Sequence, residues 1–167
     1  MKLVVFFSLI ALCFVFAGRD PSLFADGNNY AEYVEHVLAG IDVHAEPSFN
    51  LIVGLVGELG LYGVFFVYLM LGFFLKGTYF LLKMPANSHI IFIYLTNYFV
   101  IHDLVQIRVG GALGLALWAV HHFGERNIWI ASFLMLAAFS LHFSVAILAA
   151  FTILIYAVDN GKIRGLS

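Results

Sequence analysis

Long apolar stretches, separated by short polar segments, run through almost the whole chain. The first covers residues 3–17 directly after Lys2, a pattern typical of a signal-peptide core or a short first transmembrane helix. Residues 18–48 are polar, but after good capping residues they contain apolar positions at helical spacing: Tyr30, Tyr33, Val34, Val37 and Leu38. The pattern predicts an amino-terminal apolar helix followed by one sizeable loop that carries a helix.

The apolar stretch that begins at Phe49 is too long for one comfortable span. We expect a short half-helix over 49–59, a break near Gly60, and a full span over about 61–82. Because several spans follow, the first apolar segment is expected to be an uncleaved transmembrane helix rather than a removed signal peptide.

Three further apolar segments follow a turn at Pro85. Residues 89–105 are expected to form a third span. A fourth span over about 109–123 contains glycines that allow close packing on a neighbour, at positions 110, 111 and 114. Residues 128–157 are interrupted by a polar notch at 140–144, so we expect two short helices there rather than one kinked helix.

These elements predict an all-α fold, a polytopic bundle of about five to six spans that includes short or broken helices. The whole chain is expected to be one integral membrane domain. Its parts are a first helix or signal anchor, an extracytoplasmic loop, a transmembrane bundle and a cytoplasmic tail, at residues 1–17, 18–48, 49–158 and 159–167.

Composition supports a lipid environment. Hydrophobic residues make up 63% of the chain and charged residues only 11%, so a water-soluble domain of this size would leave large apolar patches exposed. The net charge of −2 provides no basic field, which argues against nucleic acid as a partner. The lone Cys13 forms no intrachain disulfide, and no Cys/His spacing typical of zinc sites occurs.

The distribution of charge predicts an orientation. With the amino terminus inside, most basic residues fall at inner ends, as cytoplasmic loops require: Lys2, Lys76, Lys83, Arg126, Lys162 and Arg164. Arg19 and Arg108 are then outside. The same assignment gathers several ionisable residues at outer ends, namely Asp26, Glu46, His102, Asp103, Arg108 and His142. This gathering is the main indication of function in the residues themselves.

Arg108 is the first candidate for chemistry, because an arginine near hydrocarbon is costly unless it reaches water or binds an anion. Snorkelling to the membrane surface would satisfy it. A planar guanidinium also suits bidentate contact with a phosphate or carboxylate, which we favour, with Asp103 roughly on the same face and Gln106 close by.

His142 lies in a serine-flanked notch, where it is either a hydrogen-bonded structural residue or a proton acceptor working near neutral pH. Asp26 and Glu46 have simpler interpretations, a helix cap and a solvated acid. No glycine-rich phosphate loop, paired metal-ligand motif or nucleophile elbow occurs in the sequence, so we expect no metal and no cofactor. The residues alone indicate a membrane protein with an outward-facing polar site.

The order of the polar motifs resembles a known family. It runs Arg19, Asp26, Tyr30, then Glu46-Pro47-Ser48-Phe49, then Ile107-Arg108 opening a glycine- and alanine-rich span, then Ala138 to Ser144 around His142. This series is similar to the EpsG-like branch of Wzy-type bacterial polysaccharide polymerases over residues 15–156. Arg108 is followed by Val109 where such proteins have glutamine, so a role for that glutamine is not carried over. The resemblance corresponds to the amino-terminal half of these proteins.

The resemblance implies a membrane glycosyltransferase of the bacterial inner membrane, which polymerises undecaprenyl-pyrophosphate-linked repeats of O-antigen, capsule or exopolysaccharide. Arg108 would neutralise the departing pyrophosphate, and His142, Asp26 or Asp103 would accept the proton of the attacking hydroxyl. Substrate-binding residues would be Arg19, Tyr30, Glu46, His102 and Gln106. The partners implied are the lipid-linked glycan, the bilayer and other polysaccharide-assembly membrane proteins.

Two alternatives stay open. A non-catalytic membrane subunit, which binds lipid-linked sugar or partner helices, fits the short length. A small transporter is disfavoured, because its site would need polar groups deep in the bilayer and no internal repeat is present.

Overall fold

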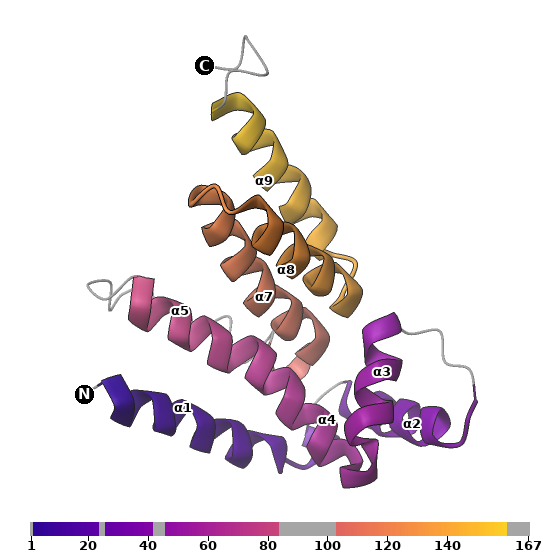
Figure 1. The fold of residues 1–167 in the computed structure, drawn as a ribbon. Coiled ribbons are helices and arrows are strands. Elements are labelled where there is room, and N and C mark those ends of the chain that lie inside the picture. The colour runs from indigo at the N-terminus through magenta and orange to yellow at the C-terminus, as the bar shows by residue number, and fades with distance from the viewer. Residues whose placement is uncertain (1, 24–25, 42–45, 84–102, 160–167) are drawn as a thin grey trace.

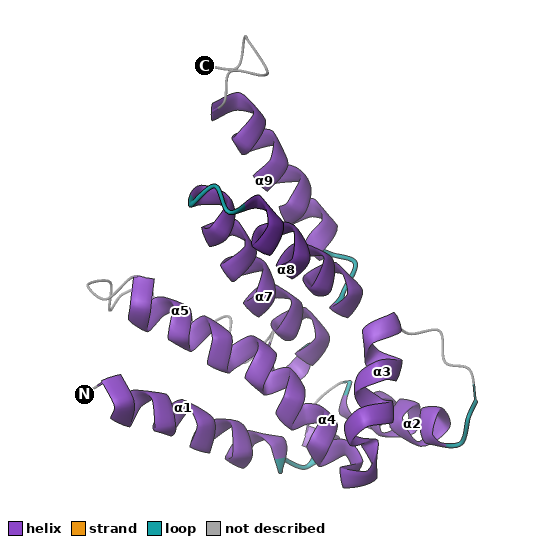
Figure 2. Cartoon of the chain, viewed as in Figure 1, coloured by secondary structure: helices purple, strands orange, loops and turns teal. Residues whose placement is uncertain are grey.

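The structure is a computed structural model that describes residues 2–23, 26–41, 46–83 and 103–159. These residues form helices joined by short loops and contain no strand (Figure 2). The predicted all-α fold is therefore confirmed for the described part of the chain.

The amino-terminal part contains one long helix and one loop helix. Helix α1 covers Lys2–Ala17, as the first apolar run predicts. After the short 3₁₀ turn η1 (Pro21–Leu23), helix α2 covers Gly27–Leu38 with Asp26 at its N-cap. Tyr30 and Val34 on one face of α2 are buried, so the helical spacing read from the loop sequence is confirmed.

The next apolar stretch is broken where the sequence predicts a break. Helix α3 (Pro47–Val56) leads through the 3₁₀ turn η2 (Gly57–Leu59) to helix α4 (Gly60–Leu69). Gly60 has φ +65°, a conformation that glycine adopts without strain. Figure 1 shows α3 turning away from the line of α4.

The second half of that stretch contains an irregularity that the sequence pattern does not predict. The π-helical turn η3 (Met70–Phe74) connects α4 to helix α5 (Leu75–Lys83). A π turn inserts an extra residue into a helix and is frequent at functional sites.

Residues 107–159 form three helices. Helix α7 (Ile107–Gly124) packs along helix α8 (Ile128–Leu141), and helix α9 (Val145–Asp159) follows after a break at the serine-flanked notch (Figure 1). The helix predicted over about 109–123 and the two short helices predicted within 128–157 are thus confirmed as helices. The predicted third span lies outside the described residues except for its last positions, 103–105.

Small residues allow the backbone of α7 to approach the backbone of η3 closely. A Cβ atom at Gly114 would lie 1.8 Å from the Leu71 carbonyl oxygen, and one at Gly72 would lie 2.8 Å from the Gly110 carbonyl carbon. The close packing that the glycines predict is therefore confirmed, and its partner is the π turn.

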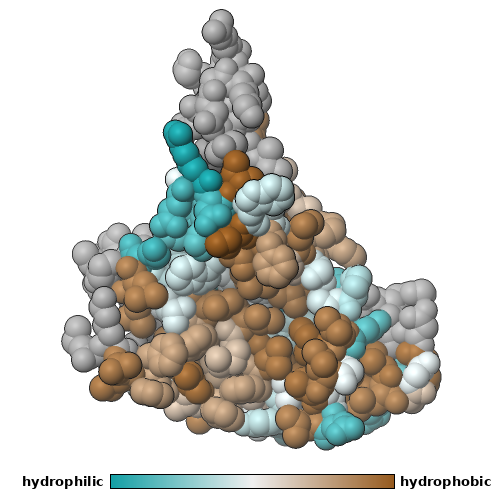
Figure 3. All heavy atoms as spheres, in the orientation of Figure 1, coloured by the Kyte–Doolittle hydropathy of each residue, from teal (hydrophilic) through white to brown (hydrophobic). Residues whose placement is uncertain are grey.

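The surface is largely apolar, and hydrophobic side chains cover most of the face shown in Figure 3. Among the described residues, the helical segment Pro47–Lys83, whose 37 residues include the break at Gly60, is long and apolar enough to cross a membrane; Phe6–Ala17 and Ile128–Leu141 are shorter apolar helices. A helical bundle agrees with the prediction, while the number of spans stays a prediction.

One placement from the charge pattern is wrong. The charge pattern predicts Lys76 at an inner end and Asp103 at an outer end, but their side chains form a buried ion pair with 2.8 Å between Nζ and Oδ1. The two residues therefore lie at the same depth. The reason is that an isolated charge in an apolar bundle is costly, so Lys76 is paired inside the protein rather than at a water-facing helix end.

Candidate functional site

The Glu46 carboxylate lies between two basic side chains from distant parts of the sequence. Its Oε2 atom pairs with Arg108 Nη1, and its Oε1 atom lies 3.0 Å from His142 Nδ1. Glu46 is only 7% exposed. The simple interpretation of Glu46 as a solvated acid is therefore wrong, because both of its oxygens are held by cationic or potentially cationic groups.

Local sequence places Glu46 at the start of α3. Glu46 has extended backbone geometry (φ −61°, ψ 144°), as expected for a residue that precedes proline. Pro47 then occupies the first helical position, where its missing N–H is not needed. This arrangement fixes the start of α3 and with it the carboxylate.

Arg108 occupies the first turn of α7, with Gln106 at the N-cap. Its guanidinium carbon lies 5.5 Å from the centre of the Tyr30 ring and 5.6 Å from that of the Phe49 ring, within cation–π range. Two aromatic rings and one carboxylate therefore contact the Arg108 guanidinium, and 22% of the side chain is exposed.

His142 ends α8, and its extended backbone (φ −161°, ψ 127°) breaks the apolar stretch in two. A second contact joins the same elements, since the Ser48 hydroxyl donates a hydrogen bond to the Ser140 carbonyl. The start of α3 and the α8–α9 break are thus held together at two points.

Tyr30 projects from the loop helix α2 into the site. Burial raises the pKa of its phenol above the usual 10.0, and the neighbouring Arg108 partly opposes this rise. The phenol is therefore neutral near physiological pH and can donate a hydrogen bond. Asp26 and Glu46 are further electrostatic neighbours of Tyr30, so Asp26 lies at the edge of the same group of residues.

Arg19 connects the end of α1 to the segment before α7. Its Nη2 donates to the Leu104 carbonyl at 2.7 Å, its Nη1 donates to Phe16, and its guanidinium lies 4.1 Å from the centre of the Phe65 ring. Burial lowers the pKa of Arg19 to about 10, with Tyr30 opposing the fall, so the group stays charged at neutral pH. These contacts serve to position the segment before α7.

The remaining predicted residues are placed differently. Asp103 binds Lys76 through both carboxylate oxygens, and Gln106 is exposed with no side-chain capping bond. His102 lies outside the described residues. The structure thus brings together Glu46, Arg108, His142 and Tyr30, and pairs Asp103 with a residue of another helix.

Sequence reasoning missed three neighbours of this group, Ser48, Phe49 and Tyr68. Ser48 and Phe49 directly follow Glu46-Pro47, so the Glu46-Pro47-Ser48-Phe49 motif already contained both residues. The Tyr68 hydroxyl has Arg108, Tyr30, Glu46 and Ser48 around it, yet Tyr68 lies inside an apolar run and nothing in the sequence distinguishes it.

The arrangement has a clear chemical meaning. The Glu46 oxygen lies 3.0 Å from His142 Nδ1 without hydrogen-bond geometry, and a carboxylate at this distance stabilises the imidazolium that forms when the ring takes up a proton. The contact with Glu46 uses only Nη1 of Arg108 among five N–H donors. The site therefore combines a proton acceptor with a cation that can bind an oxyanion.

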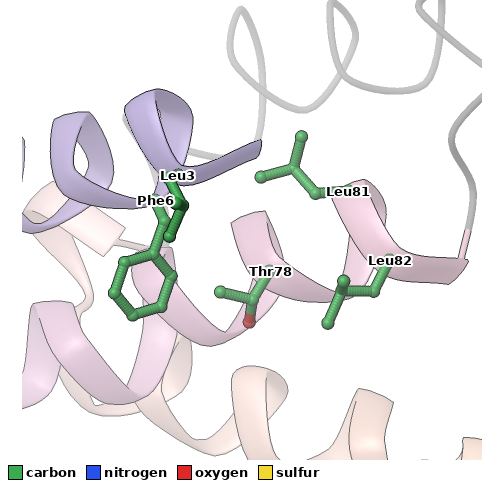
Figure 4. Close-up of a pocket in the computed structure, with 5 residues that line it drawn as sticks. All are labelled: Leu3, Phe6, Thr78, Leu81 and Leu82. Atoms are coloured by element: carbon green, nitrogen blue, oxygen red, sulfur yellow. The ribbon is translucent and has the colours of Figure 1, made fainter. Parts of the chain in front are cut away.

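An apolar pocket of about 230 Å³ lies elsewhere, between the start of α1 and the end of α5 (Figure 4). Leu3, Phe6, Leu81 and Leu82 line it together with Thr78, whose hydroxyl donates to the Leu75 carbonyl. The described lining residues offer no free polar group for chemistry. Within the described ranges, no three His, Cys, Asp or Glu side chains gather as they would around a metal ion.

Comparison with protein-family profiles matches residues 2–166 to the EpsG family. No curated protein and no solved structure matches the chain. The family resemblance read from the polar motifs is therefore confirmed. Because the match covers essentially the whole sequence, the chain belongs to the EpsG family, whose members are membrane proteins of polysaccharide biosynthesis.

Proposed function

We propose that this protein polymerises undecaprenyl-pyrophosphate-linked oligosaccharide repeats into a surface polysaccharide, at the outer face of the bacterial inner membrane. The observation that carries the proposal is the buried Glu46 carboxylate held between Arg108 and His142. Membership of the EpsG family supports a role in polysaccharide biosynthesis.

The proposed reaction is a glycosyl transfer between two lipid-linked units. The hydroxyl oxygen at the end of one glycan attacks the anomeric carbon of the other, and a new C–O bond forms. The bond between the anomeric carbon and the pyrophosphate oxygen breaks, and the pyrophosphate leaves with its electron pair. The reaction therefore needs a proton acceptor for the hydroxyl and a cation for the leaving group.

His142 and Arg108 supply these two functions in the proposal. His142 Nε2 accepts the hydroxyl proton, and the Glu46 carboxylate, 3.0 Å from Nδ1, stabilises the imidazolium that forms. Arg108 stabilises the negative charge that grows on the pyrophosphate, and the neutral Tyr30 phenol is placed to donate a further hydrogen bond. Asp103 takes no part as a base, because Lys76 occupies both of its oxygens.

The test is polysaccharide chain length, measured by gel, in a deletion strain that is complemented with the wild-type chain, Arg108→Ala or Arg108→Lys. Long chains from the wild type should collapse to single repeats in both variants. Arg108→Lys should fail because an ammonium does not reproduce the planar fork of donors. The matched control is Arg126→Asn, which removes an exposed guanidinium at a turn with φ +60°, a conformation that asparagine tolerates.

Two results would contradict the proposal. If Arg108→Ala accumulates normally and still produces long chains, the anion-binding role of Arg108 is wrong. If the wild-type chain restores no polymer, the protein is not a sufficient polymerase, and the alternative of a membrane subunit that binds lipid-linked sugar takes its place.

A further inference from the structure

A second ionic contact lies inside the bundle, separate from the Glu46 site. Lys76 in α5 donates from Nζ to both oxygens of Asp103, at 2.8 and 3.0 Å. The side chains are 5% and 1% exposed. The family comparison and the proposed reaction give this pair no role.

The surroundings of the pair leave almost no free space. A Cβ atom at Gly72, in the π turn one helical turn before Lys76, would lie 2.4 Å from Asp103 Oδ1. The same turn packs its backbone against Gly110 and Gly114 of α7. The ion pair, the π turn and the first half of α7 therefore form one tightly packed unit.

This unit lies immediately before Arg108 in the sequence. Asp103 lies four residues before the start of α7 at Ile107, and Arg108 lies in the first turn of that helix. Lys76 holds the segment before α7 from α5, and Arg19, two residues after the end of α1, holds it through the Leu104 carbonyl. This segment is thus held by charged side chains from α5 and from the loop after α1.

We infer that Lys76 and Asp103 are positioning residues, which hold the start of α7 so that Arg108 meets Glu46 and His142. The functional consequence of this inference rests on the proposed function, while its geometric part does not. Misplacing a reacting group by about 1 Å can lower a rate on the order of 100-fold, so such an anchor has a large effect on the reaction.

The energetics of buried ion pairs support positioning over stabilisation. Removing two charges from water is costly, and replacing both partners by apolar residues of similar volume is often neutral or stabilising. Removing one partner leaves an unpaired buried charge and is strongly destabilising. Directional bonds at 2.8 and 3.0 Å are suited to specifying one register of α7, and this role does not require the pair to add net stability.

The experiment replaces both partners together, Lys76→Met with Asp103→Leu, in the full chain. Two quantities are measured beside accumulation in the membrane: polysaccharide chain length, and the distance between spin labels at Leu55→Cys in α3 and Val120→Cys in α7. The spin-labelled proteins all carry Cys13→Ala, which removes the only natural cysteine. The charge-reversed pair, Lys76→Asp with Asp103→Lys, is the matched control because it keeps an ion pair.

The apolar double variant should accumulate like the wild type but show a shifted or broadened distance distribution and roughly a hundredfold less long-chain polymer. The charge-reversed variant should recover most of the wild-type distance distribution and most of the long-chain polymer. An unchanged distance distribution overturns the inference, whatever happens to the polymer. Normal polymer with a shifted distribution also overturns it, as does loss of the double variant from the membrane, since the pair would then be needed for stability itself.

The two measurements, polymer length and spin-label distance, separate this inference from the proposed function. If the wild-type chain makes no polymer, the proposed function fails, and the spin-label distances alone decide whether the ion pair positions α7.

Discussion

At the scale of single residues, the site depends on Glu46 being engaged on both sides. Arg108 lies on one oxygen of the carboxylate and His142 on the other, and Tyr30 and Phe49 cover the guanidinium. A carboxylate with only one of these partners would leave either a buried cation or an unoriented imidazole. Each residue in the group is therefore costly to bury without the others, which ties three separate helix termini to one point.

Tyr30 gives a pH prediction with a defined sign. Because burial raises the pKa of its phenol above 10.0, the folded state favours the protonated form. The stability that this contributes is fully present below the pKa of the unfolded chain and is lost as the pH rises through the higher pKa of the folded protein. The midpoint temperature of thermal unfolding in detergent, measured from pH 8 to about 11, should therefore fall less steeply with rising pH for Tyr30→Phe than for the wild type. Equal slopes would contradict this prediction, because they would show that the phenol ionises as readily in the folded protein as in the unfolded chain.

At the scale of elements, the break between α3 and α4 depends on Gly60. Its φ of +65° and ψ of −161° lie in a region that is essentially confined to glycine. Gly60→Ala should lower the free energy of unfolding by about 1–3 kcal/mol. In Gly54→Ala, a Cβ atom within α3 would meet nothing within 4 Å, so the change should be neutral or stabilising by about 0.5–1 kcal/mol. The stabilities of the two variants are compared by thermal unfolding in detergent. An equal loss of stability in both would contradict the argument that the backbone conformation of Gly60 requires glycine.

The same elements show how far the sequence leads. The helical spacing in the loop, the break at Gly60 and the notch at His142 were predictable, because each depends on local backbone preference or on periodicity. The π turn at Met70–Phe74 was not, since it arises where α7 packs against that segment. The partner of Lys76 was missed for a related reason, because charge counting assigns a lysine to a helix end and carries no information about a distant aspartate.

For the candidate site, the sequence supplied the residues but not their contacts. Arg108, His142, Glu46 and Tyr30 could be named because polar groups in an apolar chain are conspicuous. That Glu46 bridges the two basic residues depends on how α3, α7 and α8 pack together, which no local pattern contains. Tyr68 was missed because a tyrosine in an apolar run is ordinarily read as core.

At the scale of the whole molecule, the two ends of α7 carry different chemistry. Arg108 at the first turn faces Glu46 and His142, whereas Glu125 after the last turn lies 3.7 Å from Lys83 and 3.0 Å from His121. The 18 residues of α7 correspond to a length of about 27 Å, close to the hydrocarbon thickness of a bilayer at about 30 Å. If α7 spans the membrane, the candidate site and the Lys83–Glu125 pair lie on opposite faces.

This separation predicts which thiols react from outside the cell. In a Cys13→Ala background, Ile41→Cys after α2 should react with a membrane-impermeant thiol reagent in cells whose outer membrane alone has been opened. Asn127→Cys, in the turn between α7 and α8, should react only after the inner membrane is also opened. Both positions are exposed in the structure, so a difference in labelling reports on sidedness rather than on burial. Labelling of Asn127→Cys from outside would reverse the orientation, and it would place the Glu46 site on the cytoplasmic face, where lipid-linked repeats are not polymerised in the proposed reaction.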